Sequence, residues 1–233
     1  MKTLKPPMQR NLLISLCVGL ALACPMQLAG ADASDQADKD GLVLKSRTKQ
    51  RVVWVRPGAT FGQYDKVVIV DCMVAFQKDW QRNYNNSVDD PSRMVTDEKV
   101  KEMKTWLSQE FKRVFAKRLQ KGGYQVVDAP GPGVLSLRPA IVEVQVTAPD
   151  IMSAGMNMNV VTSAGSGVFY LEVWDTATNT ILARAMDAEA DRQPFARQAN
   201  SVTNAQAADV ILEGWADDLV RHLDAVRAKP SST

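Results

Sequence analysis

The stretch Lys66-Val67-Val68-Ile69-Val70-Asp71-Cys72-Met73-Val74-Ala75-Phe76 decides the fold class of this chain. Its even-numbered positions from Val68 to Phe76 are all apolar and its odd-numbered positions are mixed, which is the period-two pattern of a strand with one face buried. We therefore expect one continuous central or half-buried strand, with Cys72 pointing into the core. A thiol in such a place is usually a small buried hydrophobe and not a reactive group.

A long amphipathic helix is predicted after this strand. Thr96 is the expected N-cap, and Asp97 and Glu98 lie in the first turn, where the positive end of a helix favours acids. Gly122 and Gly123 are expected to end the helix with left-handed backbone. Between these ends, apolar side chains recur three and four residues apart and predict one stripe that faces the core. The stripe consists of Val100, Met103, Leu107, Phe111, Val114, Phe115 and Leu119.

Alternating apolar residues elsewhere predict the rest of a sheet. Val134–Val146 is apolar at odd positions before Pro139 and at even positions after it, so we expect a bulge or a sheet edge at Pro139. Val168–Trp174 and Ile181–Met186 flank a turn-forming segment and predict a hairpin. Two shorter predicted strands are Arg51–Val55 and Tyr124–Asp128.

A second long helix is predicted near the C-terminus, beginning at Thr203 or Asn204. The whole order of elements is strand, strand, helix, strand, strand, hairpin and helix, which is typical of an α+β domain. We expect a mostly antiparallel sheet with two long helices packed on one face. The apolar stripe of the second helix consists of Ile211, Trp215, Leu219, Leu223 and Val226.

The N-terminus has the pattern of an export signal. A basic start is followed by the apolar run Leu12–Cys24, and Ala29-Gly30-Ala31 offers the small residues that a signal peptidase requires. We predict a signal peptide over residues 1–31, a polar flexible leader over 32–50 and a single α+β envelope domain over 51–229.

A second processing pathway stays open. Leu20-Ala21-Leu22-Ala23-Cys24 is a degenerate lipobox, in which Cys24 would be lipidated and become the mature N-terminus. Leu22 stands where a smaller residue is usual. Cleavage near Ala31 or Ala33 places the protein in the periplasm, whereas lipidation of Cys24 tethers it to the periplasmic face of the outer membrane.

Charge and the inventory of reactive groups exclude several classes of function. The chain carries 28 Lys and Arg against 26 Asp and Glu, without a dense basic run, which argues against nucleic acid as a partner. His222 is the only histidine, so a multi-histidine metal site is excluded. We expect His222 to be half-buried near a helix C-terminus, where its charge suits the helix dipole. Met152, Met156 and Met158 are read as flexible packing and not as a copper site, and no cofactor is expected.

Acidic residues at strand ends and in loops leave a carboxylate-dependent cell-wall or glycan hydrolase open as an alternative. No spacing singles out a pair, so no catalytic residue is assigned. A further alternative is a small lipophilic-ligand carrier, which needs an apolar cavity between helices and sheet. The acids in question are Asp71, Asp150, Asp175, Asp187 and Asp191.

The best candidate for a recognition surface is the aromatic and polar stretch Asp79–Asn86. We read it as part of a long loop, Gln77–Val95, because it has no clear period. Aromatic residues and Arg are enriched among interface anchors, although loop aromatics also fold back to cover the edge of a core. The candidate interaction residues are Asp79, Trp80, Arg82 and Tyr84.

Several short motifs follow one another in a specific order: Val53-Trp54-Val55-Arg56-Pro57-Gly58, Tyr64-Asp65-Lys66-Val67, Gly123-Tyr124-Gln125-Val126-Val127-Asp128, Leu137-Arg138-Pro139-Ala140-Ile141, Ala148-Pro149-Asp150 and Ser163-Ala164-Gly165. In this order they resemble an uncharacterised bacterial lipoprotein family, domain-of-unknown-function family 3313, over Leu42 to Arg227. The resemblance implies an envelope protein whose relatives are usually lipidated, and it transfers no catalytic residue. The layout also resembles the small α+β domains of Gram-negative envelope lipoproteins that act as accessory subunits.

The sequence therefore favours a non-enzymatic cell-envelope protein. We expect an accessory or binding module at the periplasmic side of the outer membrane, with an envelope protein or a cell-wall polymer as its partner.

Overall fold

The central element of the fold is an eight-stranded sheet, seen in a computed structural model that describes residues 37, 39–147, 159–161, 165–190, 197–199 and 201–227. These residues belong to one compact unit, Gln36–Thr233. The strands are β1 (Val43–Arg47), β2 (Arg51–Val55), β3 (Lys66–Ile69), β4 (Met73–Phe76), β5 (Gln125–Val126), β6 (Val134–Val146), β7 (Asn159–Val161), β8 (Gly165–Asp175), β9 (Thr180–Ala190) and β10 (Arg197–Ala199). The helices are α2 (Trp80–Asn86), α3 (Asp97–Lys121) and α4 (Ser201–Arg227), with a short 3₁₀ turn at Pro91–Arg93.

The sheet is mixed, which corrects the expectation of a mostly antiparallel one. Its order is β1-β2-β9-β8-β6-β3-β5, with β4 also paired to β6, and β7 and β10 form a separate two-stranded ladder. The half from β1 to β6 is antiparallel, whereas β3, β4 and β5 all run parallel to their neighbours. The reason is α3, which carries the chain from β4 back to β5 in the same direction, as a parallel pair requires.

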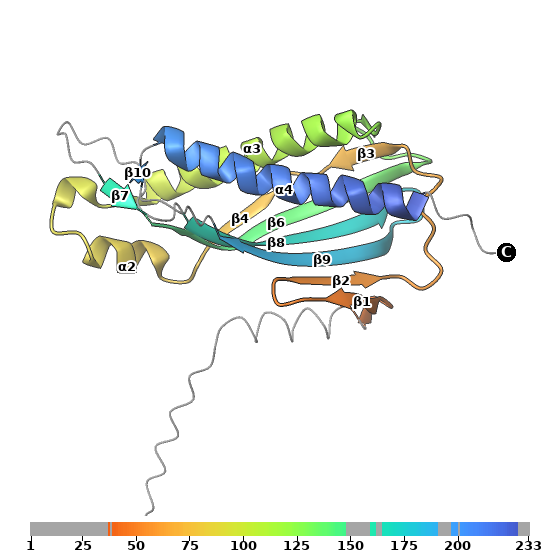
Figure 1. Cartoon of the computed structure of the whole chain (residues 1–233), viewed down its shortest axis with the longest axis horizontal. Helices are drawn as coiled ribbons and strands as arrows, with labels where there is room; N and C mark the ends of the chain where they lie inside the picture. The colour runs from red at the N-terminus through yellow and green to blue at the C-terminus, as the bar shows by residue number, and fades with distance from the viewer. Residues whose placement is uncertain are drawn as a thin grey trace, which may run out of the picture. The chain divides into compact units, whose positions relative to one another are not determined.

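Two long helices pack on one face of the sheet, as expected (Figure 1). The ring of Phe169 on β8 lies 5.7 Å from that of Phe111 and 5.6 Å from that of Phe115, both on α3. The same ring lies 4.8 Å from that of Trp215 on α4. Because one side chain of the sheet contacts both helices, α3 and α4 cover the same face. All four rings are at most 6% exposed and form the centre of the core.

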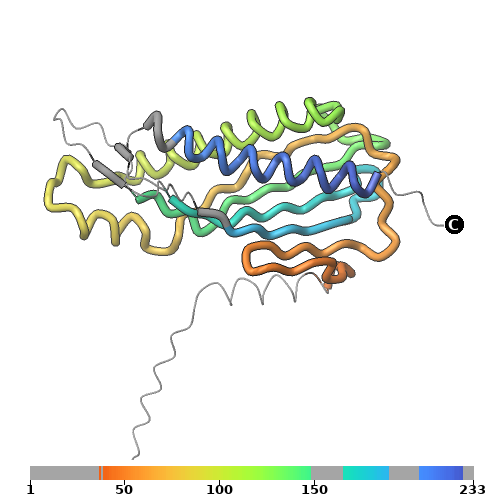
Figure 2. The backbone as a smooth tube through the Cα atoms, in the orientation of Figure 1, coloured from red at the N-terminus to blue at the C-terminus, as the bar shows by residue number. Residues whose placement is uncertain are grey.

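The stretch Lys66–Phe76 forms two strands instead of one. Val67 and Ile69 are buried in β3, Val70 is 45% exposed, and burial returns at Cys72. The buried face therefore switches from odd to even positions between β3 and β4, so the even positions do not share one face as expected. The prediction that Cys72 is buried is confirmed, since it is 5% exposed. After β2 the chain runs past the ends of the other strands to reach β3 near the opposite edge of the sheet, as Figure 2 shows.

The phase change within β6 arises from a bulge that lies later than expected. Pro139 pairs in register with Leu171 and interrupts nothing. The ladder to β8 shifts between Val142 and Gln145, and Glu143 adopts a left-handed backbone with φ 54°. An extra residue at this point moves the apolar side chains to the opposite parity. The expected bulge exists, but Glu143 forms it in place of Pro139.

Helix α3 has the ends that its sequence predicts. The Thr96 hydroxyl accepts a hydrogen bond from the Lys99 amide at 3.2 Å, which is the capping contact. At the C-terminal end Gly123 takes φ 84°, whereas Gly122 keeps φ −77°, so only one of the two glycines is left-handed. Among the helices that the structure describes, none has the combined length and apolar character needed to cross a membrane.

Part of the predicted leader forms a strand. β1 lies within residues 32–50 and forms the edge strand beside β2. Just before it, the Leu42 amide donates to the Ala37 carbonyl at 2.9 Å, and both residues are at most 1% exposed.

Candidate functional site

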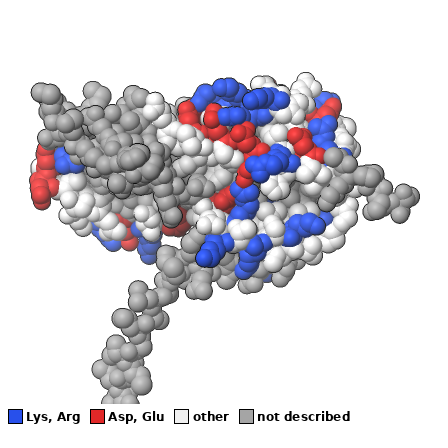
Figure 3. All heavy atoms as spheres, viewed as in Figure 1, with Lys and Arg blue, Asp and Glu red and all other residues white. Residues whose placement is uncertain are grey.

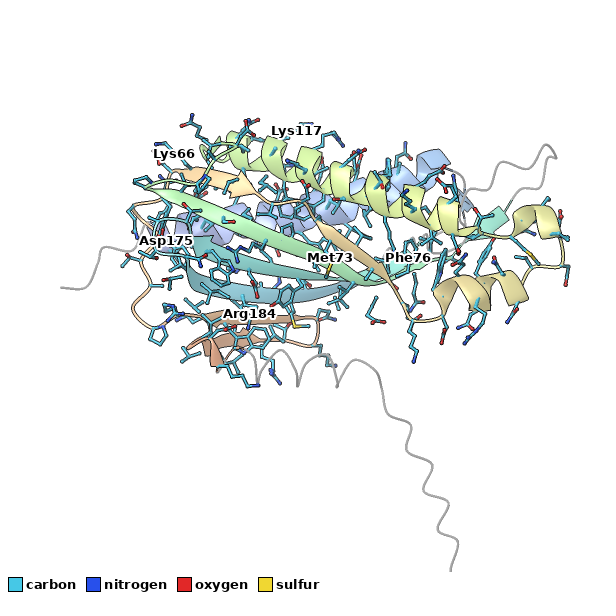
Figure 4. The ribbon with its side chains drawn as sticks, turned by 180° about the vertical axis from the view of Figure 1, so that it is seen from behind. Lys66, Met73, Phe76, Lys117, Asp175 and Arg184 are labelled. Carbon is cyan, nitrogen blue, oxygen red and sulfur yellow. The ribbon has the colours of Figure 1, made fainter. Side chains whose placement is uncertain are left out.

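The sheet face opposite the two helices carries a row of side chains from four strands. Arg138 on β6 pairs in register with Glu172 on β8, Glu172 pairs with Arg184 on β9, and Arg184 pairs with Trp54 on β2. Figure 4 views this region from behind and labels Arg184. We call this row, with Tyr170 and Trp174, the outer-face cluster.

Glu172 is the centre of the outer-face cluster. Its carboxylate accepts hydrogen bonds from the Tyr170 hydroxyl at 2.6 Å, the Trp174 indole at 2.9 Å and the Arg184 guanidinium at 2.7 Å. Burial alone would raise the pKa of Glu172, but these donors outweigh it and hold the pKa below its usual value. Burial and the bond to Glu172 together raise the pKa of Tyr170. The carboxylate is therefore held ionised and cannot serve as a proton donor near neutral pH.

The end of the outer-face cluster near β2 is closed by the start of the domain. The Arg184 side chain is 2% exposed and forms ion pairs with Asp40 at 2.5 Å and Glu172 at 2.7 Å. Trp54 beside it is 2% exposed. One guanidinium nitrogen of Arg184, Nη1, is buried without a hydrogen-bond partner. The ion pair with Asp40 holds residues 39–42 over this half of the outer face.

The other end of the same face is open. The Arg138 guanidinium lies 4.1 Å from the centre of the Trp174 ring, a cation–π contact, and also donates to Asn179 at 3.3 Å. Met73, which pairs with Ala140 on this face, is 61% exposed, and Val70 just before β4 is 45% exposed. Figure 4 labels Met73 on β4. We call Val70, Met73, Arg138 and Trp174 the open surface.

Three of the four candidate interaction residues, Trp80, Arg82 and Tyr84, lie on helix α2 and not in a loop, and Asp79 is its N-cap. Trp80 is 7% exposed, its ring centre lies 4.5 Å from that of Phe76, and its indole N–H donates to the Val146 carbonyl at 3.2 Å. Tyr84 lies 5.9 Å from Trp80 and is half-buried. Arg82 is exposed and forms an ion pair with Asp79 at 3.0 Å. Trp80 therefore covers the end of β6, whereas Arg82 and Tyr84 remain available at the surface.

Neither lone reactive residue is placed for catalysis. Burial raises the pKa of the Cys72 thiol to about 12, so the nucleophilic thiolate is scarce at neutral pH. His222 is exposed and not half-buried as expected, whereas the next residue, Leu223, is the one that this turn of α4 buries. Its Nδ1 lies 2.6 Å from the Asp218 carbonyl, within the same helix.

The described acids that sequence reasoning considered for a hydrolase serve local structure. The Asp175 carboxylate accepts from the Ala177 amide at 2.9 Å and the Thr178 hydroxyl at 2.7 Å, which shapes the hairpin turn. Asp187 accepts from Arg51 at 2.6 Å. Asp71 is exposed and faces Lys112 at 3.4 Å. The structure does not bring these three carboxylates into one group.

One carboxylate pair was missed because its members lie on different helices. Glu110 on α3 and Asp209 on α4 share Arg113, which contacts Glu110 at 2.8 Å and Asp209 at 3.3 Å. Partial burial and the neighbouring Glu110 raise the pKa of Asp209 to about 6, whereas Arg113 lowers that of Glu110. Two apolar stripes predict that two helices pack together, but not which polar residues meet along their seam.

Several predicted positions lie outside the described residues: Cys24, Asp150, Asp191, Met152, Met156 and Met158. Within the described part of the chain, no group of three or more His, Cys, Asp or Glu is arranged to hold a metal ion. The outer-face cluster itself was missed, although the alternation Tyr170, Glu172 and Trp174 on one side of β8 is visible in the sequence.

These features define a class of protein: an α+β domain with a mixed sheet, two helices on one face and a partly open opposite face. The chain belongs to the family described as protein of unknown function (DUF3313), whose pattern matches residues 33–219. This confirms the family resemblance drawn from the sequence. No curated protein matches the chain.

Solved structures resemble the chain only distantly. A PelC dodecamer from Paraburkholderia phytofirmans is 11% identical, with 77% of this chain and 99% of that chain covered and a TM-score of 0.38. A DUF330 protein from Xanthomonas campestris is 13% identical, with coverages of 82% and 97% and a TM-score of 0.39. A minor lipoprotein from Acinetobacter baumannii is 10% identical, with coverages of 70% and 95% and a TM-score of 0.32. These scores are too low to carry an argument about function.

Proposed function

We propose that this chain is a non-enzymatic accessory module of the cell envelope, which binds a partner protein at the periplasmic side of the outer membrane. The export pattern of residues 1–31 supports the compartment, and the degenerate lipobox at Cys24 offers a tether. The proposal further assigns the partner to the sheet face that the helices leave uncovered.

The observation that carries the proposal is the composition of the open surface. Val70 and Met73 are large apolar side chains exposed beside Arg138, whose charge is stacked on Trp174. Trp, Met and Arg are enriched in protein–protein interfaces, and the apolar pair adds area that gains from being covered.

The geometry gives less support to the two alternatives. A glycan hydrolase needs one carboxyl group with a raised pKa and a second carboxylate across a substrate site. Asp209 has a raised pKa, but Arg113 bridges it to Glu110 between two helices. A lipophilic carrier needs an apolar cavity, whereas the rings of Phe111, Phe115, Phe169 and Trp215 fill the space between helices and sheet at spacings of 3.9 to 5.7 Å.

The first experiment is the intact mass of the mature protein purified from envelope fractions of its own host. An acylated chain that begins at Cys24, or an unmodified chain that begins near Asp32, supports export. A full-length chain recovered from the cytosol contradicts the proposal.

The second experiment tests the open surface by crosslinking in intact cells. The double variant Val70→Asp, Met73→Asp should lose a specific crosslinked product while its melting temperature stays close to that of the wild type, since both side chains are exposed. Val210→Asp on α4 is the matched control, because Val210 is 66% exposed on another element. Equal crosslinking of all three proteins rules out the open surface as the binding site.

A further inference from the structure

The β1–β2 hairpin carries an unusual concentration of positive charge. Between Asp40 and Asp65 the chain contains no acidic residue but five basic ones. Elsewhere after Ala31, 20 basic residues face 26 acids, so the hairpin is a cationic region on an otherwise acidic chain. Figure 3, drawn in the view of Figure 1, shows Lys and Arg side chains (blue) grouped along the lower part of the molecule, where Figure 1 places β1 and β2. The five residues are Lys45, Arg47, Lys49, Arg51 and Arg56.

Two of the five cations are used inside the fold. Arg51 forms ion pairs with Asp187 and Asp218, which join β2 to β9 and α4. Arg56 donates to the carbonyl oxygens of Ile181 and Asp40, both at 2.7 Å. These contacts fix the hairpin to the domain. They account for Arg51 and Arg56 but not for the other three cations.

The other three cations, Lys45, Arg47 and Lys49, are not used in this way. All three residues are exposed, and none has an acidic partner within the described part of the chain. The hairpin tip that carries them is well formed, because the Thr48 amide donates to the Arg51 carbonyl at 2.7 Å and its hydroxyl accepts from the Arg51 amide at 2.9 Å. The three positive charges are therefore carried by a turn whose backbone is hydrogen-bonded.

Exposed apolar side chains lie beside these charges. Val43 is 51% exposed and Leu44 is 52% exposed, both on the same edge strand as Lys45 and Arg47. Cations attract anionic headgroups, and apolar side chains gain by entering the boundary between headgroups and acyl chains. We propose that the exposed part of the β1–β2 hairpin, Val43–Lys49, is a contact surface for anionic phospholipid bilayers.

The position of the hairpin in the chain fits this partner. The described domain begins at Ala37, next to the hairpin, and the ion pair of Asp40 with Arg184 holds this entry point in place. An extended chain of 13 residues from Cys24 to Ala37 spans at most about 45 Å. A lipid anchor at Cys24 would therefore keep the hairpin within reach of the bilayer. The inference thus rests on the proposed function for its biological setting, although lipid contact itself does not require processing at Cys24.

An alternative role for the cations is protection of the free edge of β1. Lys and Arg on an edge strand prevent pairing with other strands. Protection alone does not explain why Val43 and Leu44 are exposed at the same edge, since apolar edge residues favour association. Lipid contact accounts for both kinds of side chain.

The test is flotation of the unacylated mature chain from Asp32 with vesicles of phosphatidylethanolamine and phosphatidylglycerol. Vesicles of phosphatidylcholine alone serve as the uncharged reference. The variant Lys45→Glu, Arg47→Glu, Lys49→Glu should bind anionic vesicles about 100-fold more weakly, because each cation near such a surface contributes about fivefold. Added salt should weaken the binding of the wild type.

The matched control is Lys78→Glu, Lys101→Glu, Lys117→Glu, which makes the same change of net charge at exposed lysines elsewhere. It should keep most of the vesicle binding. The neutral variant Val43→Ser, Leu44→Ser should reduce binding while leaving its salt dependence intact.

Three outcomes overturn the inference: no binding to anionic vesicles, equal loss in the hairpin and control variants, or self-association of the hairpin variants with unchanged lipid binding. The last outcome would assign the cations to edge protection. None of these results depends on the partner crosslinking or on the mature mass, so failure here is distinct from failure of the proposed function.

Discussion

The two faces of the sheet are stabilised in different ways. The face under α3 and α4 is closed by stacked rings, with Phe111 and Phe115 3.9 Å apart and Phe169 between both helices. The outer face buries a charged group, Arg184, whose contacts run to Glu172 and Asp40. The stabilisation from apolar contacts depends on how closely the side chains pack. The stabilisation from a buried charge depends on whether each of its partners is present.

This difference determines how each face tolerates substitution. The helix-covered face loses stability in proportion to the volume removed, and its neighbours relax only partially. The outer face is sensitive to which partner is removed, because a lost guanidinium leaves a carboxylate with too few donors.

The largest effect is expected for Phe169→Ala on the helix-covered face. The substitution removes a ring that contacts both helices and should lower the free energy of unfolding by about 3–5 kcal/mol. Urea unfolding followed by circular dichroism measures it. Trp106→Ala is the control, because Trp106 is 41% exposed and should change stability by less than about 1 kcal/mol. Similar losses in both variants would contradict the assignment of the core.

A smaller loss is expected for Arg184→Met on the outer face. The change leaves Glu172 half-buried without its cation and should cost about 2–4 kcal/mol, less than for a fully buried pair because the Glu172 side chain is 18% exposed. The double variant Arg184→Met, Glu172→Leu should recover part of this loss, since no unpaired charge remains. A double variant less stable than the single one would show that the ion pair is not the cause.

A still smaller effect is expected for Asp40→Ala. Arg184 keeps Glu172, so the loss should be about 1 kcal/mol. Hydrogen exchange should speed up at Leu42, whose amide bonds to Ala37, while amides in α3 keep their protection. Unchanged exchange at Leu42 would show that the Asp40–Arg184 ion pair does not hold the start of the domain.

The smallest effect concerns the exposed seam between α3 and α4. The pKa of Asp209 is raised from 3.8 to about 6, so the folded state holds this proton more tightly than the unfolded chain. The contribution is fully present below about pH 4 and is lost as the pH rises through about 6. Asp209→Asn should remove this pH dependence and stabilise the protein at pH 7 by less than about 1 kcal/mol, because the side chain is 38% exposed and screened.

Thermal unfolding from pH 4 to pH 8 measures this effect. Asp217→Asn on the same helix is the control, because it removes one exposed carboxylate of α4 and leaves Glu110, Arg113 and Asp209 intact. A variant Asp209→Asn with the same profile as the wild type would exclude Asp209 as the titrating group.

Elements with a strong local signal could be predicted from the sequence. The N-cap at Thr96, the buried positions from Phe111 to Leu119 and the hairpin of β8 and β9 all depend on residues near one another in the chain. The mixed character of the sheet could not be predicted in this way, because strand direction depends on α3 acting as a crossover. The pattern of Lys66–Phe76 did not predict its break, since Val70 is apolar yet exposed.

The candidate site was predicted less well than the fold. Trp80, Arg82 and Tyr84 were singled out by residue type, but type alone did not reveal that Trp80 covers the end of β6. The outer-face cluster requires four different strands in register, and a pairing register is not visible in any one of them. Local patterns predict secondary structure better than they predict which polar groups meet.

The mixed sheet also has a consequence for the order of folding. β8 and β9 are joined by the turn between Asp175 and Thr180, so their pairing closes only a short loop. Lys66, by contrast, pairs with Val134 across the whole of α3, and closing a long loop costs more chain entropy before any contact rewards it. We infer that the antiparallel hairpin forms before β3 pairs with β6 and before β2 pairs with β9, since Arg51 and Asp187 are still farther apart in the chain. Until α3 docks on the sheet, its apolar stripe is exposed to chaperones and proteases.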